Sequence, residues 1–345
     1  MEKLNIFSTR QTQYLAEKVI SEINRLRKND EEFVDLPNTQ LGECEIEEFS
    51  NGELTCQYKT SIRDKKIYIF GQTGTHEIME LLLMIDAAKR ASVDKVIVVV
   101  PSYGYARQDK KEGIRGPMGA KLVADLLSAA GIHGIITIEL HADAIQGFFN
   151  VPINHINGYS IMSREIRRII GDKKDDYIIC SPDAGGSVRA NKLSKKLGLF
   201  GAIAINKERD KPGSIGKMIL MADVTGKHII LFDDMCDSGG TLCKAADYLI
   251  EEKGAASVIA VCTHPIFSKN AIEKISTTKN LSALYVSDTL NFESKILDSD
   301  AAWSKTGGGT EYQSDKIKTI SCSTILAQII GRISRGKSMD TINNG

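Results

Sequence analysis

The chain has 345 residues, 42% of them hydrophobic and 26% charged, so it can bury a sizeable core and its length suggests two domains. Lys plus Arg and Asp plus Glu both number 44, and this zero formal net charge argues against a nucleic-acid-binding protein that relies on overall positive charge. Seven cysteines without a CxxC pair, no visible secretory signal and no long apolar run favour a cytoplasmic protein with reduced thiols and no membrane or nucleic-acid partner.

Short β-branched segments alternate with helical patterns along the chain. Helical apolar spacing covers residues 77–90 and 242–253, and the second helix is expected to open at Thr241 and to end before Gly254. Such alternation is typical of α/β proteins with parallel sheets. The predicted strands are IYIF (67–70), KVIVVV (95–100), GIITIEL (134–140), YIIC (177–180), AIAI (202–205), HIILF (228–232) and SVIAVC (257–262).

Two of these strand–helix–strand segments resemble each other. A shift of 162 residues superposes IYIF, its helix and VIVVV on IILF, its helix and VIAVC. We therefore predict two similar α/β domains in tandem, residues 1–155 and 156–345, each a mainly parallel sheet flanked by helices. The last segment is able to pack back on the first domain. The alternative is that any β–α–β unit has this length.

Only the second copy carries acids after its first strand, in LFDDMCDSGGT (231–241). Carboxylates accept hydrogen bonds from sugar hydroxyls, and glycine-rich backbone at a helix start can bind a phosphate through its N–H groups. The carboxyl end of a parallel strand is also where such sheets bind ligands. This favours a sugar-phosphate site over an acidic helix cap. Its candidate residues are Asp233, Asp234, Asp237, Ser238, Gly239, Gly240 and Thr241.

This loop resembles the phosphoribosyl-binding loop of type I phosphoribosyltransferases. Other stretches are more specific, and they occur in the expected order: FSNGE (49–53), YARQDKK (105–111), ELHADAIQGFF (139–149), SPDAGG (181–186) and INKERD (205–210). Together they resemble the phosphate-regulated class of ribose-phosphate pyrophosphokinases, and the match runs over most of the chain. The resemblance implies two domains of the type I phosphoribosyltransferase fold.

The resemblance also implies a reaction for nucleotide biosynthesis. The C1 hydroxyl of ribose 5-phosphate would attack the β-phosphorus of ATP, with Mg²⁺ as cofactor, so that AMP leaves and 5-phosphoribosyl 1-diphosphate forms. It further implies self-association into a homohexamer built of dimers. The sequence leaves the oligomer size and the choice of nucleotide donor open.

Nucleotide and metal roles follow from the same resemblance. Phe49, from a neighbouring subunit, would face the adenine, and Asn51 and Glu53 would read its edge. An Arg guanidinium can lie on an adenine ring while serving phosphate. The implied nucleotide-binding residues are Phe49, Asn51, Glu53, Arg107, Gln108 and His141, and the implied metal residues are His141 and Asp183.

Glu139 stands where many relatives carry aspartate, and its role is left open. An extended backbone would place the side chains of Glu139 and His141 on one face of the strand.

INKERD precedes the segment PGSIGK, whose glycines and proline suit a loop that opens and closes. Transfer of a diphosphoryl group develops negative charge on phosphate oxygens, and two cations on a lid would stabilise that charge. Lys207 and Arg209 are therefore the candidate catalytic residues. Without the resemblance, they would be read as part of a charged surface loop.

Three residues match positions at which the phosphate-regulated members bind an anion between subunits: Ser61, Arg63 and Arg115. The resemblance implies activation by phosphate and competition by ADP. The stretch from Leu290 to Lys316 is longer than in typical relatives and falls near this region, so it could block or reshape such a site.

Two other functions share part of this sequence pattern. A phosphoribosyltransferase shares the loop at 233–241 but needs neither a second α/β domain nor the FSNGE and YARQDKK motifs. A catalytically silent subunit would be expected to lack lid cations or loop acids, which this chain retains.

Overall fold

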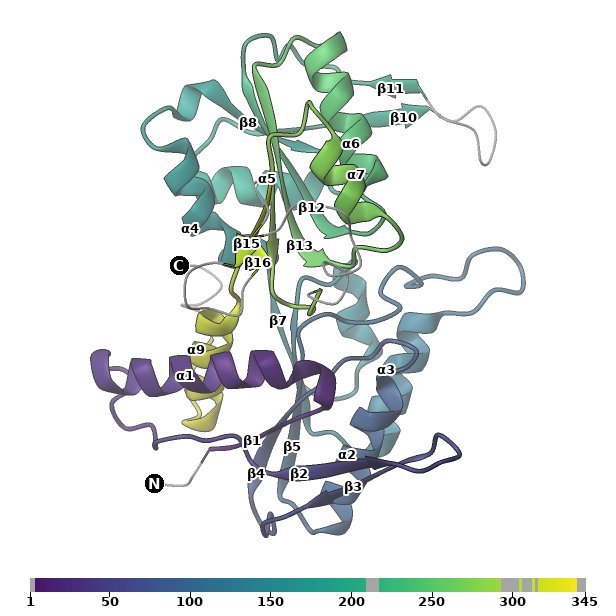
Figure 1. Ribbon diagram of the computed structural model, residues 1–345, viewed down its shortest axis with the longest axis vertical. Coiled ribbons are helices and arrows are strands. Elements are labelled where there is room, and N and C mark those ends of the chain that lie inside the picture. The colour runs from purple at the N-terminus through teal and green to yellow at the C-terminus, as the bar shows by residue number, and fades with distance from the viewer. Residues whose placement is uncertain (1–3, 209–216, 293–303, 306–311, 314–315, 340–345) are drawn as a thin grey trace. The chain divides into compact units, whose positions relative to one another are not determined.

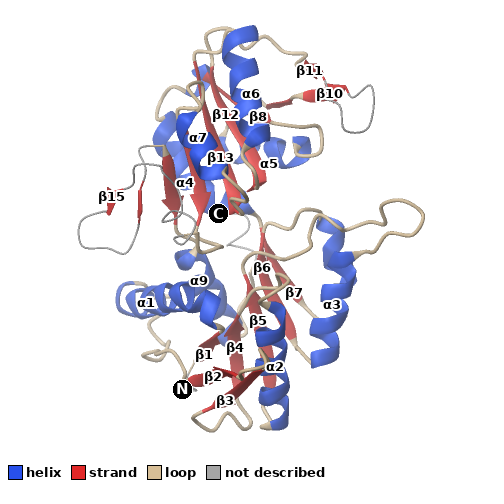
Figure 2. Cartoon of the chain, turned by 45° about the vertical axis from the view of Figure 1, so that its right-hand side comes forward, coloured by secondary structure: helices blue, strands red, loops and turns tan. Residues whose placement is uncertain are grey.

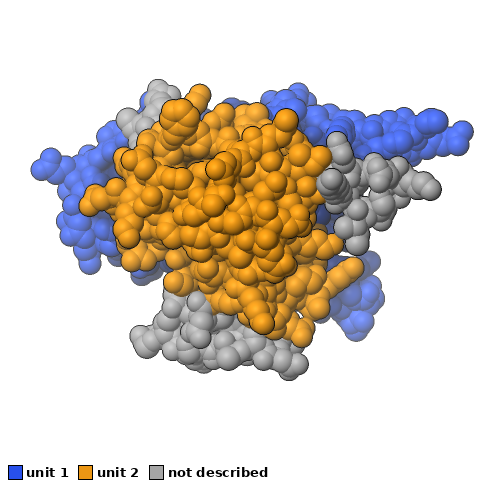
Figure 3. Space-filling view, turned by 90° about the horizontal axis from the view of Figure 1, so that it is seen from above, with its two compact units in different colours: residues 1–157, 322–345 blue, residues 158–321 orange. Residues whose placement is uncertain are grey.

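The structure is a computed structural model that describes residues 4–208, 217–292, 304–305, 312–313 and 316–339. The chain forms two compact units, whose residues are coloured in Figure 3: unit 1 comprises residues 1–157 and 322–345, and unit 2 comprises residues 158–321. Each unit is built on a parallel sheet with flanking helices (Figure 1), which confirms the predicted fold class.

Unit 1 contains a five-stranded sheet whose order, β1-β4-β5-β6-β7, follows the sequence, and all of its pairs are parallel. The central strands β4, β5 and β6 are largely apolar and buried, as expected for a parallel sheet that helices cover (Figure 2). The strands are β1 (Asn5–Ser8), β4 (Lys66–Phe70), β5 (Lys95–Val100), β6 (Gly134–Ile138) and β7 (Ile153–Ile156). The helices in residues 1–157 are η1 (Arg10–Thr12), α1 (Gln13–Asn29), α2 (Ile78–Arg90), α3 (Gly119–Ala130) and η2 (Asp143–Phe148).

Two further parts complete unit 1. The antiparallel hairpin of β2 (Cys44–Glu48) and β3 (Leu54–Tyr58) forms a separate two-stranded sheet, and β3 contacts α2. The C-terminal helix α9 (Ser323–Ser334) packs against α1, as Figures 1 and 2 both show. Arg332 Nη2 donates to Glu32 Oε2 at 2.8 Å, which joins α9 to the turn after α1.

Unit 2 contains a six-stranded parallel sheet in the order β17-β14-β13-β12-β8-β9. These strands are β8 (Tyr177–Ser181), β9 (Ala202–Ala204), β12 (His228–Cys236), β13 (Ser257–Pro265), β14 (Ala283–Ser287) and β17 (Ile317–Ile320). The helices are α4 (Gly158–Ile170), η3 (Lys174–Asp176), α5 (Ser187–Leu197), α6 (Gly240–Asp247), the π-helical turn η4 (Tyr248–Glu252) and α7 (Ala271–Thr277). Two antiparallel pairs join β10 (Asn206–Glu208) to β11 (Lys217–Ile219) and β15 (Ser304–Lys305) to β16 (Tyr312–Gln313).

The order in which strands are added to the parallel sheet of unit 2 reverses at β8. After β8 the chain moves outward to β9, and then it returns to β12 on the opposite side of β8. Such a reversal opens a crevice at the carboxyl ends of the two strands, where open α/β sheets bind ligands. The site of unit 2 is therefore expected between the ends of β8 and β12.

The predicted strands are all present, and β5 has the predicted bounds. GIITIEL is strand only to Ile138, whereas β12 extends past the predicted HIILF to Cys236. The prediction that Thr241 opens the following helix is wrong, because α6 begins at Gly240 and its N-cap is Gly239. Gly239 has a left-handed φ of 70°, which glycine adopts without steric cost.

Neither unit contains, among its described residues, a helix that is both long and apolar enough to cross a bilayer. All seven cysteines are free thiols.

Candidate active site

β12 carries the two adjacent acids at the chain reversal of unit 2. Its pairing with β8 ends at Leu231, opposite Cys180, whereas its pairing with β13 continues to Cys236, opposite Pro265. Asp233 and Asp234 lie in this extension, beyond the end of the β8 ladder. The acids are thus held on an ordered strand and not on a mobile loop.

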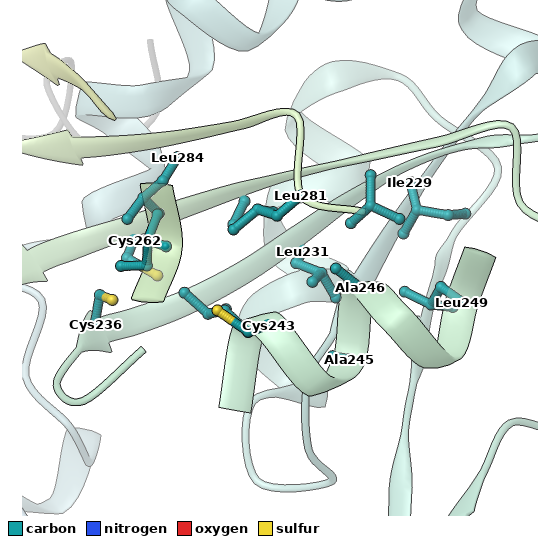
Figure 4. Close-up of a cluster of buried hydrophobic side chains, with 14 of the residues drawn as sticks. Ile229, Leu231, Cys236, Cys243, Ala245, Ala246, Leu249, Cys262, Leu281 and Leu284 are labelled. Atoms are coloured by element: carbon teal, nitrogen blue, oxygen red, sulfur yellow. The ribbon is translucent and has the colours of Figure 1, made fainter. Parts of the chain in front are cut away.

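A hydrophobic core fixes this strand against the helix that follows the loop. Figure 4 shows Ile229 and Leu231 of β12 with Ala246 and Leu249 from α6 and η4. All four are buried. Because both ends of the connecting loop are anchored in one close-packed core, the loop geometry is set by packing.

Three acids share the crevice with one guanidinium. Arg189 Nη1, on α5, lies 3.7 Å from Asp233 Oδ1 and 3.6 Å from Asp234 Oδ1. Burial, together with the charges of Asp234 and Asp183, raises the pKa of Asp233 well above its usual range, and Arg189 opposes this rise. Asp234 is only 3% exposed. The excess of negative charge suits a cation or hydroxyl donors.

Arg189 was not identified from the sequence. It lies two residues inside a helix and far along the chain from Asp233, so no local pattern distinguishes it from a surface arginine. Its position shortly after SPDAGG is the one signal that could have drawn attention to it.

The loop after the acids leads into the start of α6. Asp237 and Ser238 are half-buried and Thr241 is exposed. The backbone is held from the neighbouring β13–α7 segment, where Ser268 N–H donates to the Asp237 carbonyl at 3.0 Å. The first N–H groups of a helix and its dipole favour an anion, so this loop can hold a phosphate.

Lys274 of α7 adds a cation that the sequence had not indicated. Its Nζ donates to the Ser238 carbonyl at 3.2 Å. This hydrogen bond places an ammonium group beside the candidate phosphate loop.

In unit 1, three nucleotide candidates lie at one edge of the sheet. Arg107 and Gln108 follow β5, His141 follows β6, and β5 pairs with β6. All three side chains are exposed, but the backbone beneath them is pinned: Gln108 N–H donates to the Tyr105 carbonyl at 2.8 Å, and Ala120 N–H donates to the Gln108 carbonyl at 3.2 Å.

The extended backbone expected from Glu139 to His141 is not present. Glu139 has a φ of 39° and is 5% exposed, whereas His141 is exposed. The strand ends at Ile138, so the alternation of a strand no longer applies to these two residues.

FSNGE forms the tight turn of the β2–β3 hairpin. Phe49 N–H donates to the Glu53 carbonyl at 2.8 Å, and Glu53 N–H donates to Asn51 Oδ1 at 3.1 Å, which leaves the Phe49 ring 53% exposed. In Figures 1 and 2 the hairpin lies at a different end of unit 1 from the loop after β5. Within this unit, the turn is not brought together with Arg107 and His141.

The structure describes the three regulatory candidates and only part of the proposed lid. The backbone of Lys207 lies in β10, opposite Met218, and Arg209 falls outside the described residues, as does most of 290–316. Ser61 and Arg63 are exposed between β3 and β4, and Arg115 is exposed before α3.

The described residues contain no cluster of three or more His, Cys, Asp or Glu side chains with metal-binding geometry. Asp183 belongs to unit 2 and His141 to unit 1. Asp183 Oδ1 accepts a hydrogen bond from Gly186 N–H at 3.1 Å, which orients its carboxylate at the end of β8.

Comparison with known proteins identifies the family. Residues 4–131 match the N-terminal domain of ribose phosphate pyrophosphokinase, and residues 155–295 match the phosphoribosyl transferase domain. The chain is 36% identical to the ribose-phosphate pyrophosphokinase of Porphyromonas gingivalis over 98% of its own length and 97% of the relative's. It is 38% identical to that of Bacillus caldolyticus, over 93% and 96%.

A solved structure gives the same result. Phosphoribosylpyrophosphate synthetase from Mycobacterium smegmatis superposes with a TM-score of 0.81 at 30% identity, covering 97% of this chain and 100% of that one. These matches confirm the enzyme class predicted from the motifs. The chain therefore belongs to the ribose-phosphate pyrophosphokinases, the enzymes that form 5-phosphoribosyl 1-diphosphate.

Proposed function

We propose that the residues at the crevice of unit 2 bind ribose 5-phosphate and those at the sheet edge of unit 1 bind ATP, so that the β,γ-diphosphoryl group passes to the C1 hydroxyl and AMP leaves. The observation that carries this proposal is the group of acids at the chain reversal between β8 and β12, directly followed by the glycine-started helix α6.

Asp233 and Asp234 are the proposed acceptors for the ribose hydroxyls. A buried polar group that lacks a hydrogen-bond partner costs free energy, and Asp233 lies largely buried beside Asp234 and Asp183, so sugar hydroxyls would satisfy it. The backbone of Ser238 to Thr241 and the start of α6 would hold the 5-phosphate, with the Lys274 ammonium beside it.

For the nucleotide, Arg107 and Gln108 would contact the adenine and the phosphates. The Phe49 turn is exposed and lies apart from them in the same unit, which supports the proposal that a second copy of the chain supplies it. Catalysis would then require self-association, and a homohexamer built of dimers is the proposed assembly.

Mg²⁺ is the proposed cofactor, and one or two carboxylates together with substrate phosphates would suffice to hold it. Carboxylate oxygens are the ligands that Mg²⁺ prefers, and Asp183 presents such a group beside acids whose charges exceed that of Arg189. His141 is a less suitable direct ligand, because Mg²⁺ favours oxygen, so its proposed contact is with the metal-bound phosphates or water. The ion would neutralise charge on the transferring phosphates.

Lys207 and Arg209 remain the proposed catalytic cations. The β10–β11 pair positions Lys207 on an element that extends from the sheet of unit 2 (Figure 1). Cations that approach the phosphate oxygens as charge develops would stabilise the transition state more than the bound substrate.

Regulation by phosphate and ADP is proposed for Ser61, Arg63 and Arg115. Guanidinium groups bind phosphate through forked donors, and both arginines are exposed. Activity measured across phosphate concentrations, with Mg²⁺ in excess, tests this proposal. A flat response that is unchanged in Arg63→Ala would remove it.

Incubation with Mg-ATP and ribose 5-phosphate, followed by identification of the nucleotide product, tests the main proposal. We expect AMP and 5-phosphoribosyl 1-diphosphate in equal amounts. Formation of ADP would contradict the proposal, because it requires transfer of a single phosphoryl group. Pyrophosphate release from 5-phosphoribosyl 1-diphosphate and a free base would instead favour a phosphoribosyltransferase.

A further inference from the structure

The turn that carries His141 has a strained backbone. Glu139 is not glycine, yet its φ of 39° lies in the left-handed region. Such a residue keeps this conformation only where the surroundings hold it there. The contacts around Glu139 therefore show what positions the next residues.

Two successive amide groups of this turn are held by the end of β7. Glu139 N–H donates to the Ile156 carbonyl at 2.7 Å. Leu140 N–H donates to Nε2 of His155 at 3.0 Å. The first bond extends the β6–β7 pairing, in which Ile138 lies opposite Ile156. After the left-handed residue, the next N–H is bound by a side chain in place of a backbone carbonyl.

The same imidazole also faces the other side of the turn. His155 Nδ1 lies 3.9 Å from Asp143 Oδ1, and the His155 side chain is 7% exposed. In the neutral ring, the nitrogen that does not accept from Leu140 carries the proton, so the N–H is the one that faces the Asp143 carboxylate. One buried ring thus binds the amide of Leu140, directly before the exposed His141, and lies near Asp143, two residues after it.

We propose that His155 is a positioning residue for His141, which fixes the strained turn through the Leu140 amide and so holds His141 in place for the Mg-triphosphate. The inference rests on the proposed nucleotide role of His141. It goes beyond that role by assigning the geometry of the turn to a side chain on a neighbouring strand.

The test compares His155→Gln with His155→Leu. The Gln Oε1 can stand close to Nε2 and accept the Leu140 N–H, whereas Leu has similar bulk and no acceptor. We expect His155→Leu to lower kcat/KM for Mg-ATP about tenfold, because misplaced groups around a reacting centre commonly cost this much, with KM for ribose 5-phosphate unchanged. His155→Gln should stay close to the parent enzyme.

His133 provides a matched control within the same sheet. Its Nδ1 accepts a hydrogen bond from Val96 N–H at 3.1 Å, just before β6 and at the opposite end of that strand from the turn. His133→Leu removes the same kind of bond but should leave kcat/KM for Mg-ATP unchanged. An equal loss in both Leu variants would mean that general destabilisation is responsible, and would overturn the proposal.

Hydrogen exchange at the Leu140 amide reports its hydrogen bond to His155 independently of activity. Exchange should be faster in His155→Leu and near parent in His155→Gln. Unchanged exchange in His155→Leu, or faster exchange with unchanged Mg-ATP kinetics, would overturn the positioning role. If the parent protein formed no AMP, the proposed function would fail, yet this exchange measurement would still test whether His155 holds the Leu140 amide.

If His155→Leu does not fold, His155→Asn replaces it. The Asn side chain reaches only to the position of Nδ1, so it does not supply the acceptor for Leu140. We then expect Asn to behave as described for Leu and Gln to rescue. Equal kinetics of the Asn and Gln variants would overturn the proposal.

Discussion

The segments β4–α2–β5 in unit 1 and β12–α6–η4–β13 in unit 2 have the same spacing of elements and different uses. The first residues of β4, α2 and β5 lie 162 positions before those of β12, α6 and β13. The last residues of α2 and η4, Arg90 and Glu252, are related by the same shift. Two equivalent elements therefore lead to an acidic site in one unit and to none in the other.

The difference lies in space and in chain order. Gly71 is the counterpart of Asp233, and a Cβ added to it would lie 2.7 Å from Leu81 Cδ1. The Leu81 side chain of α2 thus occupies space that a side chain at residue 71 would need. In addition, the strands of the unit 1 sheet follow one another in sequence order. In unit 2, the chain places β9 on one side of β8 and β12 on the other, so the strand order reverses at β8. The acidic site is therefore confined to unit 2, where a reversal of strand order and room for the acid side chains occur together.

The largest effect is expected at the proposed catalytic cations of unit 2. Lys207→Ala and Arg209→Ala should each lower kcat about 10²-fold or more, with little change in the KM for ribose 5-phosphate, because the lost charge acts chiefly in the transition state. Steady-state kinetics would show this. Lys59→Ala removes an exposed lysine from the β2–β3 hairpin and should leave kcat unchanged. An unaltered kcat in either lid variant would contradict the assignment.

An aspartate introduced at Gly71 would test whether lack of room explains why unit 1 has no acid at this position. Gly71→Asp should destabilise the protein by about 3 kcal/mol or more, because it combines overpacking with a buried charge. Urea denaturation would measure the loss. Adding Leu81→Ala opens the contact and should recover part of the stability compared with Gly71→Asp alone. Full tolerance of Gly71→Asp would show that packing does not exclude an acid there.

Two equivalent positions, Asp234 in unit 2 and Gln72 in unit 1, test the assignment of the ribose 5-phosphate site. Asp234→Ala should raise the KM for ribose 5-phosphate about tenfold and leave ATP binding nearly intact, because its proposed partners are sugar hydroxyls. Gln72 is the counterpart of Asp234 in unit 1, and Gln72→Ala should not change that KM. Loss of ATP affinity in Asp234→Ala would mean that the pocket is misassigned.

The smallest effect concerns stability and pH. Because burial and neighbouring acids raise the pKa of Asp233 in the folded state, this group lowers the free energy of unfolding progressively as the pH rises from the ordinary pKa to the raised one. Asp233→Asn should therefore unfold at a higher temperature than the parent at pH 8, by about 2–4 °C for each kcal/mol gained. The advantage should fade as the pH falls and Asp233 takes up its proton. A gain that persists unchanged at low pH would point to another cause.

Parts of this picture follow from the sequence because they depend on local patterns. β5 is a continuous apolar run, and its bounds match the prediction. The start of α6 was misplaced by two residues because the apolar pattern begins at Leu242, whereas the helix begins at Gly240, after Gly239 turns the backbone. A pattern of apolar side chains does not reveal the residue at which the backbone turns into the helix.

Other features depend on contacts between distant residues and have no local signal. Arg189 meets the acids of β12 only once α5 packs beside β8. The left-handed Glu139 depends on the end of β7, and the extension of β12 to Cys236 depends on its pairing with β13. The chemistry of the candidate site was therefore readable from its motifs, while the groups that orient it were not.

Unit 2 is an insertion in unit 1, and this has a consequence for the order of folding during synthesis. All of residues 158–321 are made before α9, the last helix of unit 1, emerges. Unit 2 can thus complete its own core while α1 still lacks its partner α9, whose Leu326, Ile329 and Ile330 are buried in the finished unit. The first unit to begin on the ribosome is the last to be finished, and until then its apolar surface on α1 must be kept from other chains.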